Sequence, residues 1–85
     1  MFDILGTTTF KPVTIKLRGQ ARYDVVRDAH EALKLLALEW PIESSPAASE
    51  ATRLCLRLLN DDAEPNDVRQ AFVVAAKEAF AQVEA

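Results

Sequence analysis

Cysteine occurs once in this 85-residue sequence, at Cys55, so an internal disulfide framework is excluded. Glycine occurs only at Gly6 and Gly19, which excludes a glycine-rich phosphate-binding loop. No apolar run approaches the roughly 20 residues that span a bilayer. The opening stretch, MFDILGTTTF, has no basic segment before its apolar residues, so a secretory signal is not expected. Together these absences predict a cytoplasmic protein.

The composition is that of one small globular domain. Hydrophobic residues make up 49% of the chain and charged residues 27%, which is typical of a folded sequence. The length is near the lower end for a chain that folds alone around its own core. The net charge of −3 gives no general reason to expect a nucleic acid or an anionic membrane as partner.

An N-terminal β-hairpin is predicted from the alternation of apolar and polar residues. Residues 13–17 alternate with period two, the pattern of a half-buried strand. A turn at Gly19 and a returning strand over residues 22–26 follow. Residues 1–9 precede the hairpin and are interpreted as an N-terminal arm or, equally, a short added strand.

The register of this hairpin depends on the length of its loop. A three-residue loop pairs Ile15 with Val25, which keeps apolar residues together. A two-residue loop pairs Ile15 with Asp24 and places a charge on the core face. Because one residue of slip turns every side chain over, we expect the first register, which also pairs Leu17 with Tyr23.

The longest apolar-periodic stretch, residues 28–41, is predicted to form a central core helix. Asp28 is a good N-cap, and Glu31 three residues later completes a capping-box pattern. The helix must end near Trp40, because Pro41 disfavours helical geometry in the residue before it. At about 100° per residue, its apolar side consists of Ala32, Leu33, Leu36, Ala37 and Trp40.

Two further helices are predicted. Ser45 and Pro46 form an N-cap followed by proline at the first helical position, and their helix extends to about Leu59. The last helix begins at Pro65, with Asp67 in the first turn where the helix dipole favours a carboxylate. The two apolar sides consist of Ala47, Ala51, Leu54, Cys55 and Leu58, and of Val68, Ala71, Phe72, Ala75, Ala76, Ala79 and Val83.

The sequence therefore predicts an α+β fold. An N-terminal two-stranded antiparallel β-hairpin is followed by three α-helices packed on one face. Residues 10–85 make up this single ββααα domain, and residues 1–9 lie ahead of it as the arm or short added strand. The many alanines of the last helix predict a close approach between helices.

Several short motifs resemble a known family in their order and spacing. These motifs are Phe10, Pro12-Val13, Val26, Glu31-Ala32-Leu33, Trp40-Pro41, Ala51, Cys55, Leu58, Pro65, Arg69, Phe72, Ala75-Ala76 and Glu78-Ala79. Over about residues 10–80 the chain resembles the bacterial domain-of-unknown-function family 982. One departure is that a glycine expected shortly after Leu58 is absent, with Asn60-Asp61 in that position. The resemblance implies no assigned activity, cofactor or catalytic residue.

No residue is predicted to be catalytic, to bind a cofactor or to hold a metal. Cys55 falls among leucines in a helix, where a free cysteine commonly behaves as a small buried hydrophobe. His30 is expected on a helix surface, and one histidine and one cysteine on different helices do not make a zinc site. Helix capping and a solvated acidic loop explain the carboxylates Asp61, Asp62, Glu64 and Asp67.

The strongest local charge is basic and lies in or beside the hairpin. It consists of Lys11, Lys16, Arg18, Arg22 and Arg27. On the expected register Lys16, Arg18 and Arg22 share the outward face, where they could contact a nucleic acid or an acidic protein surface. Outward strand positions are normally charged, however, and no aromatic residue is expected on this face for base stacking. A nucleic-acid-binding module is therefore the alternative function.

The leading hypothesis is a small non-catalytic protein-interaction or regulatory domain with an unidentified protein partner. A two-stranded hairpin leaves two open edges and is marginally stable alone. Leu35, Leu38, Leu56 and Val74 also lie off the predicted apolar sides. They are either scattered surface residues or part of a patch for self-association. We expect a homodimer, formed by strand-edge pairing or by a leucine-rich helix face.

Overall fold

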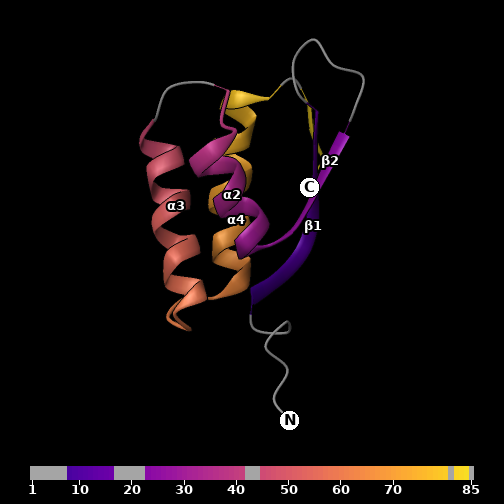
Figure 1. The fold of residues 1–85 in the computed structure, drawn as a ribbon. Helices are drawn as coiled ribbons and strands as arrows, with labels where there is room; N and C mark the ends of the chain where they lie inside the picture. Colours follow the sequence, from indigo (N-terminus) through magenta and orange to yellow (C-terminus); the bar gives the residue numbers. More distant parts are fainter. Residues whose placement is uncertain (1–7, 17–22, 42–44, 81, 85) are drawn as a thin grey trace.

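A computed structural model of the protein describes residues 8–16, 23–41, 45–80 and 82–84. Its elements are β1 (Thr9–Lys16), β2 (Tyr23–Asp28), α2 (Ala29–Leu38), α3 (Pro46–Leu59), α4 (Pro65–Ala79) and β3 (Gln82–Glu84). The described residues thus form an α+β fold with the helices together on one side of the sheet (Figure 1). None of the described helices is long and apolar enough to cross a membrane.

The sheet has three antiparallel strands in the order β2-β1-β3, so the expectation of a two-stranded hairpin was wrong in this respect. The added strand, β3, follows α4 and pairs with β1, where Ile15 lies opposite Val83. The sequence had assigned Val83 to the last helix, because it continues the spacing of that helix's apolar residues. Residues 14–16 of β1 are therefore paired on both edges, and β2 and β3 are the outer strands.

The register expected for the hairpin was also wrong. Ile15 lies opposite Asp24, and Val13 lies opposite Val26. Val26 is consequently buried against the helices, whereas Val25 faces outward. Asp24 is only half-buried near the start of β2, so its charge on the helix side costs less than the sequence argument assumed. Tyr23 lies opposite Lys16. It had been expected opposite Leu17, which lies outside the described residues. Residues 1–7 of the expected arm also lie outside them.

The predicted helix starts are confirmed by their hydrogen bonds. The Asp28 carboxylate accepts the N–H of Glu31 at 2.9 Å, and the Glu31 carboxylate accepts the N–H of Arg27 at 2.7 Å. Ser45 accepts the N–H of Ala48 through its hydroxyl oxygen at 3.2 Å. The bonds from the N–H groups of Glu31 and Ala48 satisfy donors that the first helical turn leaves without partners in the helix, whereas Arg27 precedes the N-cap of α2.

The end of α3 forms a Schellman motif at the position where the family resemblance expects a glycine. The N–H of Asp61 donates to the carbonyl of Leu58 at 2.9 Å, and the N–H of Asp62 donates to that of Arg57 at 2.7 Å. Asp61 has φ 59°, the left-handed conformation that glycine adopts without a Cβ penalty. The Asp62 carboxylate also lies 3.3 Å from Nε of Arg57.

The core lies between the sheet and the helices, and α3 packs on the far side of α2 and α4 (Figure 1). The buried side of α2 differs from the predicted one: Leu35 is buried and Ala37 is exposed. Alanines form the contact between α3 and α4, as the composition of the last helix predicted. The buried residues of α2, α3 and α4 are Ala29, Ala32, Leu35, Ala48, Ala51, Cys55, Leu58, Val68, Phe72, Ala75, Ala76 and Ala79.

Candidate functional site

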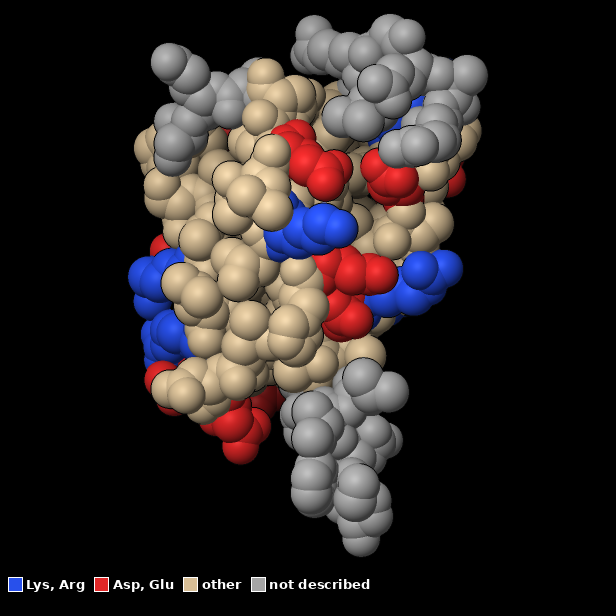
Figure 2. Space-filling view, viewed as in Figure 1, with Lys and Arg blue, Asp and Glu red and all other residues tan. Residues whose placement is uncertain are grey.

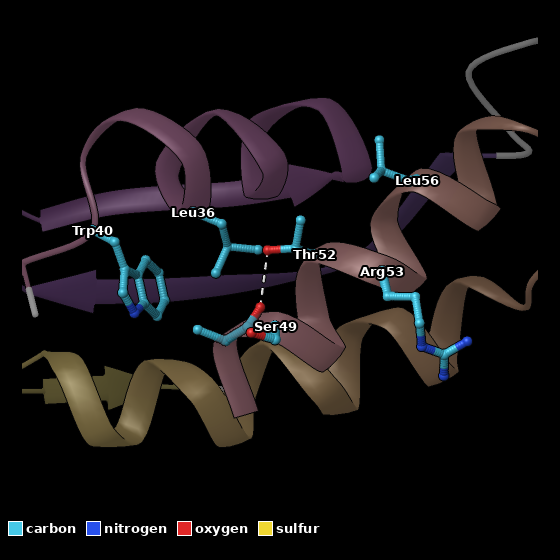
Figure 3. A pocket seen from close by; sticks show the side chains of 7 residues that line it. Leu36, Trp40, Ser49, Thr52, Arg53 and Leu56 are labelled. Atoms are coloured by element: carbon cyan, nitrogen blue, oxygen red, sulfur yellow. Dashed lines mark hydrogen bonds between the residues drawn. The ribbon is translucent and has the colours of Figure 1, made fainter. Parts of the chain in front are cut away.

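A groove of about 450 Å³ lies between the C-terminal part of α2 and one side of α3. Its lining consists of Leu36, Trp40, Ala48, Ser49, Thr52, Arg53 and Leu56. In Figure 3, Leu36 and Thr52 point toward one another across this groove, with Trp40 at one end and Leu56 at the other. We call it the α2–α3 groove.

The chemistry of the α2–α3 groove is mainly apolar. Thr52 donates its hydroxyl proton to the carbonyl of Ala48 at 2.9 Å, so this hydroxyl is already engaged. Arg53 pairs with Glu50 at 2.6 Å, and this bidentate contact holds the pKa of Glu50 below its usual range. The groove therefore offers leucine and tryptophan surface with a charge pair beside it.

Trp40 closes one end of the groove and of the core. Its ring meets Phe80 and Phe72 edge to face, with centroids 5.0 Å and 5.9 Å away. The sequence had predicted that Trp40 closes an end of the core. Within the described residues the buried indole nitrogen of Trp40 has no hydrogen-bond partner, which leaves it as a donor without an acceptor.

Two large apolar side chains stand exposed on the helices that form the groove, and of the two only Leu56 lines it. Leu38 of α2 is 76% exposed, and Leu56 of α3 is 53% exposed. Figure 2 shows a broad surface without charge over these two helices, bordered by basic side chains over α3. Of the other residues predicted off the apolar sides, Leu35 belongs to the core and Val74 is 57% exposed on α4, outside the groove lining.

A second groove, of about 290 Å³, lies between β2 and α2. Its lining consists of Asp24, Val25, Val26, Glu31, Lys34, Leu35 and Glu39. Acidic side chains gather along this border between α2 and the sheet in Figure 2. We call it the β2-edge groove. The sequence reasoning missed it, because it depends on the register that turns Val25 outward.

The outward face of the sheet carries one of the three residues predicted to contact a polyanion. Lys16 lies there, whereas Arg18 and Arg22 lie outside the described residues. Against the expectation, this face has an aromatic residue: Tyr23 is 47% exposed and donates to the side-chain oxygen of Gln82 at 3.1 Å. The ammonium of Lys16 lies 5.7 Å from the centre of the Tyr23 ring.

Cys55 and His30 lie in different environments. Cys55 is fully buried, and burial raises the pKa of its thiol to about 12. His30 is exposed on α2. No group of three or more histidine, cysteine or acidic side chains in the described part of the chain could hold a metal ion. Asp62 and Asp61 serve the end of α3 as described above, and Asp67 lies in the first turn of α4.

Comparison with known families identifies the chain. A family profile described as "Protein of unknown function (DUF982)" matches residues 11–83. The chain belongs to the DUF982 family. The matched region of this DUF982 protein contains both grooves and all of α2, α3 and α4. No curated protein and no solved structure matches the chain.

Proposed function

We propose that this DUF982 protein is a non-catalytic protein-interaction domain that acts as a homodimer, with the α2–α3 groove as its contact surface. The observation that carries the proposal is the exposure of Leu38 and Leu56 on the two helices that form the groove. Exposed apolar surface commonly marks an interaction site. The self-association is a property of the helix face, which was one of the two modes expected from the sequence.

The size of the domain fits a contact of ordinary area. The chain exposes 5334 Å², and a stable dimer covers roughly 800 Å² on each partner. One face of this small domain therefore suffices. In a two-fold dimer each contact occurs twice, so Leu56 of each copy can pack against the partner's α2–α3 groove. Burying a leucine side chain contributes about 1.5–3 kcal/mol.

The residues at the groove also resemble those that anchor protein interfaces. Tryptophan and arginine are enriched among the side chains that contribute most to binding, and Trp40 and Arg53 both line the groove. The non-catalytic part of the proposal is supported by the thiol of Cys55, which is buried and held protonated at neutral pH. A free buried thiol is also compatible with the reducing cytoplasm.

Sedimentation equilibrium at tens of micromolar tests the proposal. The wild-type protein is expected to be dimeric, and Leu56→Ser or Leu38→Ser is expected to weaken the dimer at least about tenfold, because each side chain is lost twice. Val74→Ser is the matched control, since Val74 is as exposed as Leu56 but lies on α4. A monomeric wild-type protein, or an equal effect of Val74→Ser, would contradict the proposed surface.

The alternative is a nucleic-acid-binding module that uses the outward face of the sheet. Tyr23 beside Lys16 supports it, because an exposed aromatic ring next to a cation can stack on a base. Retention on a polyanion column at low salt is expected for this function, and reversing the charge of Lys16, Arg18 and Arg22 should abolish it. Absence of retention from the wild-type protein at low salt eliminates the alternative.

A further inference from the structure

The outer edge of β2 presents backbone groups without a strand partner among the described residues. Arg27 donates its N–H to the side chain of Glu31, so this N–H points away from β1. In an antiparallel ladder, alternate residues direct their N–H and C=O groups to the same side. By this alternation Val25 and Tyr23 also direct both groups to the outer edge, and Asp24 and Val26, which lie opposite Ile15 and Val13, direct theirs toward β1.

The β2-edge groove runs beside these backbone groups. A residue added opposite Val25 would point outward with the side chains of Val25 and Tyr23, because opposite residues share a face. Its two neighbours would point toward α2, since successive side chains alternate. Those neighbours would enter the β2-edge groove, whose lining includes the nearly buried Leu35 and Val26.

The charge of this groove indicates which kind of strand can pair with the edge of β2: a second copy of the chain or a basic peptide. Asp24, Glu31 and Glu39 line it together with a single cation, Lys34. None of these three carboxylates forms an ion pair within the described part of the chain. A second copy pairing β2 with β2 around Val25 would bring its own Asp24 toward this acidic groove, which charge repulsion disfavours. A strand with lysine or arginine at the alternate positions would instead meet opposite charges.

We infer that the outer edge of β2 binds an extended basic peptide by strand addition, with its basic side chains in the β2-edge groove. Backbone hydrogen bonds to Val25 supply affinity, and the carboxylates of Asp24, Glu31 and Glu39 supply selectivity. This surface is separate from the α2–α3 groove, so the inference does not depend on the proposed dimer.

Fluorescence anisotropy with a labelled, end-capped peptide of alternating valine and lysine tests the inference. The wild-type protein is expected to bind this peptide, and a valine–glutamate peptide of equal length is expected to bind at least about tenfold more weakly. The valine–lysine peptide with a methylated backbone nitrogen at the valine opposite Val25 is expected to bind roughly fivefold more weakly, because it lacks one donor. This comparison changes only the peptide and leaves the protein unaltered.

Two pairs of variants test the edge and the charge separately. Val25→Pro removes the edge N–H, which makes no ladder bond, and Val25→Ala keeps it. Val25→Pro is expected to bind roughly fivefold more weakly than Val25→Ala. Glu39→Lys is expected to weaken binding, whereas Glu84→Lys on β3, away from the groove, is not. Circular dichroism checks that each variant folds.

Three results would overturn the inference. They are equal binding of the valine–lysine and valine–glutamate peptides, no effect of the methylated backbone, and loss of wild-type self-association in Val25→Pro. The last result would mean that a second copy occupies this edge. A failed peptide arm leaves the sedimentation test of Leu38 and Leu56 unaffected, so the two proposals fail independently.

Discussion

The ring of Phe80 meets the indole ring of Trp40 edge to face, with their centroids 5.0 Å apart and their planes at 89°. Trp40 follows α2 and Phe80 follows α4, so this contact fastens the ends of two helices that are distant in the sequence. Such aromatic pairs contribute about 0.5–1.5 kcal/mol beyond the burial of their area. The pair also forms one wall of the core just before β3 begins.

Replacing Phe80 by alanine is expected to lower the free energy of unfolding by about 3–5 kcal/mol, because a buried aromatic ring and its edge contact are lost. Phe80→Leu keeps most of the volume and should lower it much less. Urea unfolding followed by the fluorescence of Trp40, the only tryptophan, measures both. A loss below about 1 kcal/mol for Phe80→Ala would show that the ring is not part of the core.

The stability of the fold is expected to fall above pH 9 because of Cys55. Burial raises the pKa of this thiol from its ordinary value of 9.0 to about 12. The folded state therefore keeps the thiol protonated while the unfolded chain ionises it, so stability present below pH 9 is lost as the pH rises toward 12. The expected slope approaches 1.4 kcal/mol per pH unit.

Urea unfolding between pH 8 and pH 11 measures this effect, with Cys55→Ala as the control. All other titrating groups are present in both proteins, so the difference between the two curves isolates the thiol. The variant should start less stable, because it leaves a small cavity, and should lose less stability with pH. Parallel curves would mean that the thiol ionises equally in the folded and unfolded states.

Asp61→Gly is expected to stabilise the protein by roughly 0.5 kcal/mol, because Asp61 has the left-handed φ of 59° that glycine adopts freely. The greater freedom of glycine in the unfolded chain offsets part of the gain. Asp61→Ala should destabilise by about 1 kcal/mol. Thermal unfolding of the two variants gives opposite shifts of Tm if the conformation is as described, and shifts of equal sign if it is not.

Arg69→Leu is expected to destabilise β1 by about 1 kcal/mol. The Nε–H group of Arg69 donates to the carbonyl of Lys11 at 2.8 Å, inside the stretch between Thr9 and Val13 where the register of β1 shifts. Hydrogen exchange of the amides in β1 should become faster. Gln70→Ala, on an exposed neighbour in the same helix, is the control and should leave this exchange unchanged.

The sequence predicted best those features that depend on a few neighbouring residues. The helix starts at Asp28, Ser45 and Pro65 follow from local hydrogen-bond chemistry and the fixed φ of proline, and the structure confirms all three. The side of α2 that is buried could not be predicted as well. Leucine occupies several sides of that helix, so periodicity does not decide between Leu35 and Ala37.

The features that were predicted wrongly depend on contacts between residues that are distant in the sequence. Val25 and Val26 are adjacent, so one of them must face outward in a strand, and the choice depends on packing against Val13. No turn signal precedes β3, and Val83 continues the apolar spacing of α4. The sequence near β3 therefore does not predict that this segment pairs with β1. The β2-edge groove follows from that same register. The lining of the α2–α3 groove includes Leu36 and Trp40, which the spacing placed on the apolar side of the central helix, and Leu56, which the spacing left off the apolar sides.

The central position of β1 also bears on the order in which this chain can fold. Strand β1 is translated early, yet one of its edges is completed by Val83 and Glu84, near the opposite end of the matched region. During synthesis that edge therefore stays unpaired until almost the whole domain has left the ribosome. The hairpin and the helices can form as they emerge, but the three-stranded sheet can be completed only after β3 has left the ribosome.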